Sequence, residues 1–156
     1  MNTLKTVSNS EFPDLVINNF KFLFENQGFS IRSKQYTGHP LSEWIIVLTS
    51  EELDIQISID KGLVSINLGI PDKKEMSIDL MFILMYITKN FEWNYLWPGG
   101  QINAQYYDKQ LQHIATALSA NFKVIKQTVQ EITISKKEKK YFENFVKEYF
   151  QKSLEI

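Results

Sequence analysis

The chain has only two histidines, the side chains best suited to metal binding and to proton transfer near neutral pH. His39 lies in a predicted turn, Thr37-Gly38-His39-Pro40, and His113 lies in a predicted long helix. A helical zinc site would place another His, Asp or Glu three or four residues from His113. Those positions carry other residue types, namely Lys109, Gln110, Thr116 and Ala117. We therefore expect both histidines to be surface or packing residues, and we expect no metal and no cofactor.

The carboxylates and potential nucleophiles do not form a catalytic pattern either. Glu51 and Glu52 fall in a predicted hairpin turn, while Asp54 and Asp60 share one face of a predicted strand but lie far apart along it. The pair Gly99-Gly100 precedes a helix, but it lacks the preceding strand and the following Lys-Ser or Lys-Thr of a phosphate-binding loop. No Gly-x-Ser-x-Gly motif and no cysteine is present, which removes a nucleophile elbow, thiolate chemistry and disulfides. The residues therefore disfavour an enzyme.

The charge balance gives no support for a nucleic acid or membrane partner. The chain has 17 Lys and Arg residues and 18 Asp and Glu residues, so its net charge is -1. The run Lys136-Lys137-Glu138-Lys139-Lys140 is interrupted by an acid and opposes the dipole of the helix that it begins, so we interpret it as a solvated face. No apolar stretch approaches the roughly 20 residues that cross a bilayer, and the N-terminus lacks the apolar run of a signal peptide. We expect a cytoplasmic protein.

The most unusual segment is residues 91–98, Phe-Glu-Trp-Asn-Tyr-Leu-Trp-Pro, which we call the aromatic strap. Its four aromatic residues alternate with other residues between two predicted helices, without helical spacing. One interpretation is that the rings close one end of the core. The other is that Trp93, Tyr95 and Trp97 form an exposed patch that binds a protein partner. Solvent exposure of Trp93 and Trp97 distinguishes the two.

The elements that must position these residues start with a helix over residues 10–28, capped by Ser10 and ended by Gly28. Four strands follow, each short, rich in β-branched or aromatic residues, and bounded by turn residues. They are residues 29–36, 44–49, 53–60 and 64–70. Because consecutive strands are joined by short turns, we predict a four-stranded antiparallel meander in an α+β fold.

The strand over residues 53–60 alternates apolar and polar residues, which is typical of a strand with one buried face. Opposed residues of the next strand share that face only if Ile59 pairs with Val64, which leaves two or four residues around Lys61-Gly62 for the turn. The predicted pairs are then Ile59 with Val64, Ile57 with Ile66, Ile55 with Leu68, and Leu53 with Ile70. The same reasoning places Trp44, Ile46 and Leu48 opposite Ile57, Ile55 and Leu53.

Three helices follow the strands, and we expect them to pack on one face of the sheet. The first begins near Ser77 or Asp79 and ends by Asn90, and the second spans about residues 101–130. Ser135 and Glu138 have the spacing of a capping box for the third. We predict one domain over residues 1–156, with 10–97 and 101–153 as possible subdomains, the latter a helical hairpin.

Several segments together resemble small uncharacterised bacterial proteins, some of which are grouped with toxin-immunity families. The segments are a helix ending in Gly28-Phe29, the strand Trp44 to Ser50, Glu52-Leu53-Asp54-Ile55 and Asp60-Lys61-Gly62. The resemblance covers roughly residues 10–90. It implies no catalytic motif and transfers no functional residue.

The leading functional hypothesis is a protein-interaction domain, of which an immunity-type inhibitor that blocks its partner is one form. The near-neutral charge counts against a nuclease target, because inhibitors of nucleases profit from an acidic surface. The alternative is a small-ligand-binding or regulatory domain with a pocket between sheet and helices. Trp44, Trp93, Tyr95 and Tyr106 would line that pocket.

Overall fold

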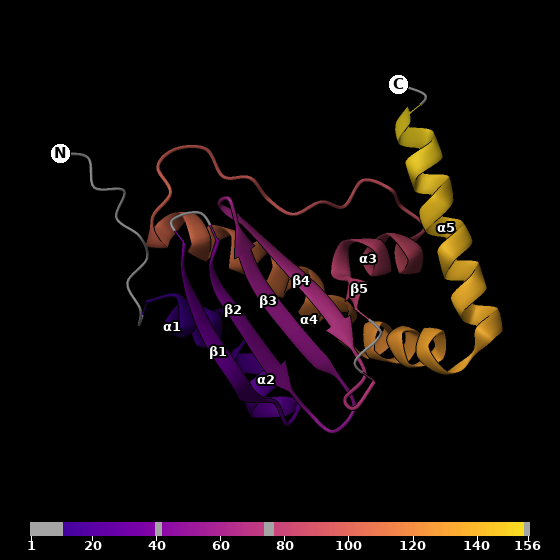
Figure 1. Ribbon diagram of the computed structural model, residues 1–156, viewed down its shortest axis with the longest axis horizontal. Coiled ribbons are helices and arrows are strands. Elements are labelled where there is room, and N and C mark those ends of the chain that lie inside the picture. The colour runs from indigo at the N-terminus through magenta and orange to yellow at the C-terminus, as the bar shows by residue number, and fades with distance from the viewer. Residues whose placement is uncertain (1–10, 40–41, 74–76, 155–156) are drawn as a thin grey trace.

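The computed structural model describes residues 11–39, 42–73 and 77–154, and it confirms an α+β fold with an antiparallel meander (Figure 1). In the described residues the sheet has five strands in the order β1-β2-β3-β4-β5. They are β1 (Ser30–His39), β2 (Ser42–Thr49), β3 (Asp54–Asp60), β4 (Leu63–Gly69) and β5 (Ile78–Asp79). The helices are α1 (Glu11–Asn19), α2 (Lys21–Asn26), α3 (Leu80–Thr88), α4 (Ala104–Ile134) and α5 (Lys136–Leu154). The predicted cap at Ser10 lies outside the described residues.

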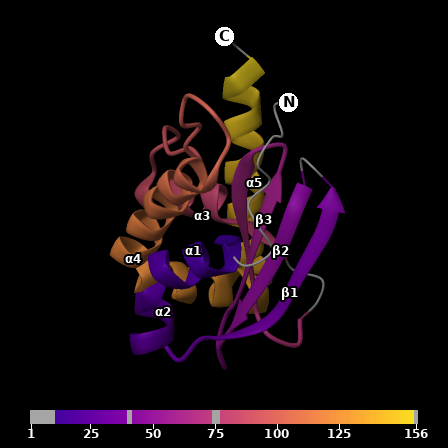
Figure 2. The ribbon, with the colours of Figure 1, turned by 90° about the vertical axis from the view of Figure 1, so that its left-hand side faces the viewer.

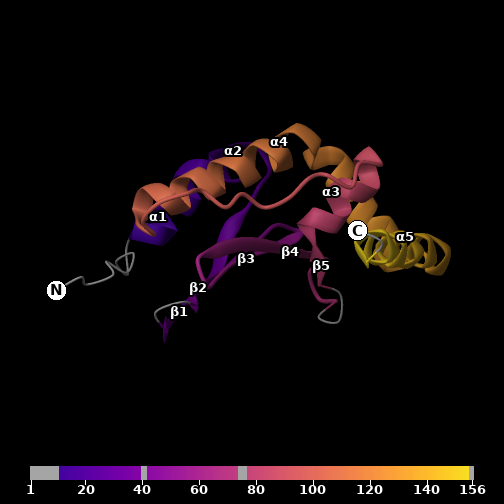
Figure 3. The same cartoon turned by 90° about the horizontal axis from the view of Figure 1, so that it is seen from above.

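The core lies between one face of the sheet and the helices α1, α2 and α4 (Figures 2 and 3). Along β3 and β4 every second residue is buried, as the two-residue period predicts. Phe12 and Val16 of α1 and Leu111 and Ile114 of α4 complete the core from the helical side, all fully buried. The opposite face of the sheet carries no helix in Figure 3, and we call it the open face.

The β3–β4 hairpin has the predicted register. Ile59 pairs with Val64, Ile57 with Ile66 and Ile55 with Leu68. Lys61 and Gly62 form the two-residue turn, with φ of 52° and 81°. Positive φ at both turn residues matches the right-handed twist of the strands, which is why a glycine stands at the second position. The paired segment described for β3 and β4 ends at Asp54 and Gly69, one step before Leu53 and Ile70.

The predicted β2–β3 register was wrong by two residues. Ile46 pairs with Ile57 and Leu48 with Ile55, whereas the sequence pattern predicted Ile46 opposite Ile55. The reason is the connecting loop, in which Ser50 N–H donates to Leu53 O at 3.0 Å. This bond keeps Leu53 in the loop, although it is fully buried. A shift of two leaves every side chain on its predicted face, so the hydrophobic pattern alone could not detect the difference.

Two further details differ from the prediction. The N-terminal helix is two helices, broken at Phe20, whose φ and ψ of -107° and 25° are not helical. Val16, Phe20 and Leu23 keep helical spacing across the break and are all fully buried, so the break does not change the predicted apolar face. The strand β5 has two residues, too few for an alternation to be visible in the sequence, and its Asp79, one of the two predicted helix starts, also caps α3.

Helix α5 begins at the predicted place, with Glu138 N–H donating to the Ser135 hydroxyl. The prediction that it packs on the sheet face is wrong. The helix stands beside the β5 end of the sheet and packs on α3 (Figures 1 and 3). Edge-to-face ring contacts join Phe82 to Tyr149 and Tyr86 to Phe142. The reason is space, because α4 is 31 residues long and, with α1 and α2, already covers the inner sheet face.

Candidate functional site

The aromatic strap is held to the rest of the protein at three of its four rings. Phe91 stacks on Phe145 of α5, with ring centroids 4.9 Å apart. Trp93 stacks on His113 of α4, with centroids 5.2 Å apart and planes 7° from parallel. Tyr95 is buried, whereas Trp97 is 59% exposed. The structure therefore assigns three of these rings to packing and leaves Trp97 at the surface beside the exposed Leu96.

Tyr95 ties the strap to the edge of the sheet through its hydroxyl. The oxygen lies 2.7 Å from Asp79 Oδ1 and 3.1 Å from Ile66 O, both acceptors for its single proton, and it accepts from Ile66 N–H at 3.2 Å. Asp79 Oδ1 also accepts from Met81 N–H at the start of α3. Burial raises the pKa of the Tyr95 phenol, and the neighbouring Asp79 carboxylate raises that pKa further. The phenol is therefore a neutral structural group.

Gln110 of α4 covers the same edge of β4, two residues along the strand from the contact of Tyr95 with Ile66. Val64 N–H donates to Gln110 Oε1 at 2.9 Å, and Gln110 Nε2 donates to Gly62 O at 2.8 Å. Its side chain is 1% exposed. Gln110 and Tyr95 thus take the backbone groups of β4 that a further strand would use, so this edge is closed to strand addition. Sequence reasoning missed this role, although Gln110 lies at helical spacing among apolar residues of α4.

His113 serves in packing, as its lack of spaced ligands predicted. Besides stacking on Trp93, its Nε2–H donates to Asn94 O at 2.8 Å, because a carbonyl can only accept. In the described part of the chain no group of three His, Asp or Glu side chains could hold a metal ion. The side chain of His39 is not among those described.

The four residues predicted to line an internal ligand pocket lie in the core. Trp44, Tyr95 and Tyr106 are buried, and Trp93 is half-buried. Trp44 packs on Tyr36 of β1, with ring centroids 5.2 Å apart, whereas Trp93 packs on His113 and Tyr95. The indole N–H of Trp44 is buried and has no hydrogen-bond partner within the described residues.

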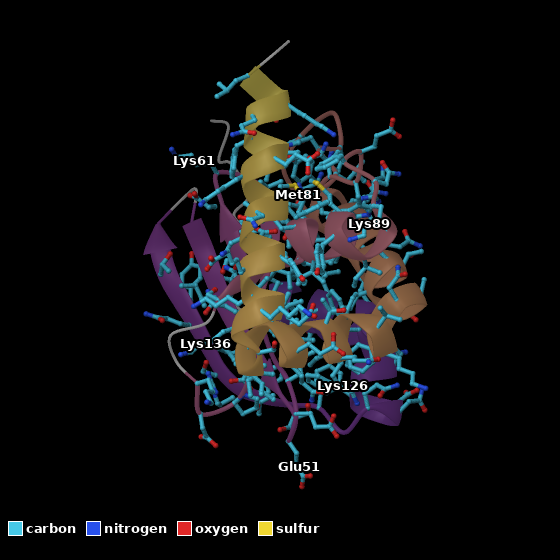
Figure 4. All side chains as sticks on the ribbon, turned by 90° about the vertical axis from the view of Figure 1, so that its right-hand side faces the viewer. Glu51, Lys61, Met81, Lys89, Lys126 and Lys136 are labelled. Atoms are coloured by element: carbon cyan, nitrogen blue, oxygen red, sulfur yellow. The ribbon has the colours of Figure 1, made fainter. Side chains whose placement is uncertain are left out.

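An apolar surface that sequence reasoning missed lies on α5. Phe142 alone among the α5 side chains is buried, although the helix is 19 residues long. Phe150 is 53% exposed and Leu154 is 86% exposed, four residues apart on one stripe. Figure 4 shows α5 in front of the other described elements, with its outward side uncovered. The signal that sequence reasoning missed was the stripe of Phe150 and Leu154, which lies beside the apolar face of α5 that packs on α3.

A cavity of about 500 Å³, which we call the α5 groove, adjoins this helix. Its apolar lining comes from α5, α3 and the short edge strand β5. The residues are Ile78, Phe82, Phe142, Val146 and Phe150. Helix α5 carries six Lys residues against three Glu residues, in a chain whose net charge is -1. An apolar groove therefore lies against the most cationic element of the fold.

A second cavity, of about 530 Å³, lies on the open face of the sheet, and we call it the sheet cavity. Arg32 of β1 and Asp54 of β3 meet across β2, with Arg32 Nη1 donating to Asp54 Oδ2 at 2.7 Å. The Thr49 hydroxyl of β2 donates to the other oxygen of Asp54. The sheet cavity and the α5 groove share the lining residues Asn67 and Ser77, so the two are neighbours.

Comparison with known proteins identifies no relative: no family model, no curated protein and no solved structure matches the chain. None of the helices in the described ranges is both long and apolar enough to cross a membrane. Function must therefore be inferred from the surfaces of the molecule itself.

Proposed function

We propose that this protein is a protein-interaction domain whose main contact surface is the exposed stripe of α5 together with the α5 groove. The observation that supports the proposal is the exposure of Phe150 and Leu154 beside an apolar cavity of about 500 Å³. A contiguous apolar surface rimmed by charged residues is typical of a protein contact. An immunity-type inhibitor, which blocks the partner that it binds, is the narrower form of the proposal and rests on the resemblance of residues 10–90.

The chemistry of α5 also indicates the kind of partner. A side chain inserted into the α5 groove would contact Phe82, Val146 and Phe150, so the partner presents an apolar anchor. The surplus of Lys residues on α5 favours an acidic surface around that anchor, because opposite charges accelerate encounter and disfavour wrong partners. The exposed Trp97 and Leu96 of the strap are a second, smaller contact candidate.

Affinity capture from the native host, followed by quantitative binding of the purified partner, tests the proposal. The variant Phe150→Ala/Leu154→Ala removes both exposed side chains of the α5 stripe. Burying two such side chains in a complex contributes roughly 3 kcal/mol, so the dissociation constant should rise about a hundredfold. The matched control is Val124→Ala, an exposed apolar residue of α4.

A second arm separates α5 from the strap. If Trp97→Ala abolishes binding and the α5 variant does not, the strap is the contact surface and the assignment to α5 is wrong. If neither variant changes the affinity, both surfaces are excluded. The immunity-type form further requires that the captured partner is a toxic protein whose activity is lost in the complex, and a partner that stays active in the complex contradicts it.

A further inference from the structure

The open face of the sheet forms a hollow, the sheet cavity, whereas the polar face of a sheet is ordinarily exposed to solvent. Apart from the exposed Asp60, the outward residues of β3 and β4, including Asp54, Gln56 and Asn67, are half-buried. Gly69, which pairs with Asp54, is the last residue of β4, so no side chain projects from that strand end beside the Asp54 carboxylate.

A β-bulge in β1 directs Arg32 into this hollow. The register between β1 and β2 shifts between Ile31 and Ser33, which leaves Arg32 unpaired in the ladder. Its side chain crosses β2 to reach Asp54, and it remains 54% exposed. The contact with Asp54 uses Nη1, so the other N–H groups of the guanidinium remain available to a ligand.

The turn after β4 supplies a second pair of opposite charges at the rim of the sheet cavity. Lys73 N–H donates to Ile70 O at 3.1 Å, and Asp72 has φ of +70°. With Pro71 at the second position, this is a type II turn, in which the third position favours glycine. Asp72 therefore carries a side chain at a position where the backbone conformation favours glycine. Backbone strain of this kind is concentrated at functional sites.

Several polar groups of the sheet cavity are not used by the fold. Within the described residues, no hydrogen bond or ion pair involves the side chains of Asn67, Asp72, Lys73 or Ser77. The cavity thus offers cationic donors at Arg32 and Lys73, an anionic acceptor at Asp72, and the amide of Asn67. With Asp54, which is paired with Arg32, the described lining carries two cations and two anions, and this balance disfavours a polyanion and favours a ligand that carries both charges.

We propose that the sheet cavity binds a small zwitterion of the amino-acid or short-peptide class. Its carboxylate is held by Arg32 and Lys73, its ammonium group by Asp72, and its amide by Asn67. The volume of about 530 Å³ falls in the range of small-molecule sites, about 300–1,000 Å³. An apolar side chain of the ligand points past Asn67 and Ser77, which line both cavities, toward the α5 groove. The charged contacts at Arg32, Lys73 and Asp72 lie outside the α5 groove and do not depend on a protein partner, whereas the apolar side chain of the ligand and the anchor of a partner would share that groove.

Calorimetric titration of the full chain with the dipeptide leucyl-glycine tests the proposal, and chemical-shift changes locate the site. The probe should bind saturably, whereas its N-acetylated and its C-amidated forms should each bind about tenfold more weakly, since each lacks one charge. Glycyl-glycine should also bind more weakly, and equal affinity would overturn the placement of the side chain in the α5 groove.

The variants assign each charge to its residue. Arg32→Met and Asp72→Asn should each weaken leucyl-glycine binding about tenfold, and Asp72→Asn should abolish the preference for the free amine over the acetylated form. Asn tolerates the positive φ of position 72, and Asp72→Gly should lose binding without a lower Tm, which separates a binding role from a folding role. Lys123→Met and Glu25→Gln, exposed charges on α4 and α2, are the matched controls.

Three results would overturn the proposal. They are no saturable binding of the dipeptide, equal affinity for the capped and free forms, and losses in the control variants equal to those at Arg32 and Asp72. Because Phe150→Ala/Leu154→Ala leaves all four polar groups of the cavity in place, the preference for the free over the capped dipeptides should persist in this variant, so the protein-partner experiment can fail while the zwitterion site stands, and the reverse also holds.

Discussion

Replacing Gln110 by leucine should destabilise the protein strongly, although leucine is a better helix former and nearly the same size. The change leaves the Val64 N–H and the Gly62 carbonyl without partners in a region where Gln110 is 1% exposed. Each orphaned buried group costs about 1–3 kcal/mol, so the pair costs roughly 2–6 kcal/mol. That is a large share of the roughly 5–15 kcal/mol by which a domain is stable.

Urea unfolding monitored by circular dichroism measures this loss, and thermal unfolding checks it. A loss of about 3 kcal/mol corresponds to a Tm about 6–12 °C lower for a chain of this size. Hydrogen exchange should show faster exchange of the Val64 amide in the variant. Gln112→Leu is the matched control, because Gln112 lies on the same helix and is exposed.

The charged variant Gln110→Glu adds a pH test. Burial raises the folded-state pKa of the introduced carboxyl above its unfolded value of about 4.3. Its protonated form can both accept from Val64 N–H and donate to Gly62 O, so stability is retained below that unfolded pKa and is lost as the pH rises through the folded value. If Gln110→Leu costs less than about 0.5 kcal/mol, or no more than Gln112→Leu, the assignment of Gln110 as the partner of the β4 edge is refuted.

Three further predictions concern the strand edge, the alkaline limit and the tight turn. Tyr95→Phe should cost about 1–3 kcal/mol in urea unfolding, because Ile66 and Asp79 each lose the hydroxyl contact, and a loss within error would contradict the bonding described. Because the pKa of Tyr95 is higher in the folded state than its unfolded value of about 10, wild-type stability should fall as the pH rises above that value, and less steeply in Tyr95→Phe. Gly62→Ala should cost about 1–2 kcal/mol, since φ is +81° and the new Cβ would lie 3.0 Å from Ile102 Cδ1, whereas Gly99→Ala should be neutral because nothing lies within 4 Å. Equal effects of the two glycine variants on Tm would contradict that reasoning.

The β3–β4 hairpin could be predicted because two local signals agree on it. The alternation of apolar residues assigns each side chain to a face, and the two-residue turn at Lys61-Gly62 sets the register. The β2–β3 register failed because a shift of two residues preserves every face, so the pattern contains no information that separates the alternatives. That register depends on how Ser50 and Leu53 bond within the loop.

The candidate sites were less predictable, because each is formed by residues distant in the sequence. Trp93 and Trp97 lie four residues apart with the same side chain, yet one stacks on His113 and the other is exposed. Nothing in the local pattern of the strap distinguishes them. The sheet cavity likewise brings together Arg32, Asp54 and Asp72. Arg32 reaches Asp54 from a bulge in β1, and no periodic pattern in the sequence indicates that bulge.

By itself, the sequence determined the class of fold, the inner and outer faces of the central strands, and the absence of a motif for metal or nucleophile chemistry. These properties follow from periodicity, turn residues and residue types, which act over a few neighbours along the chain. Only the tertiary structure decided that α5 stands beside the sheet, that Gln110 and Tyr95 close the β4 edge, and that two cavities lie on either side of Asn67. Those properties depend on which surfaces remain uncovered once α1, α2 and α4 have filled the inner face, and this is a competition for space that involves the whole chain at once.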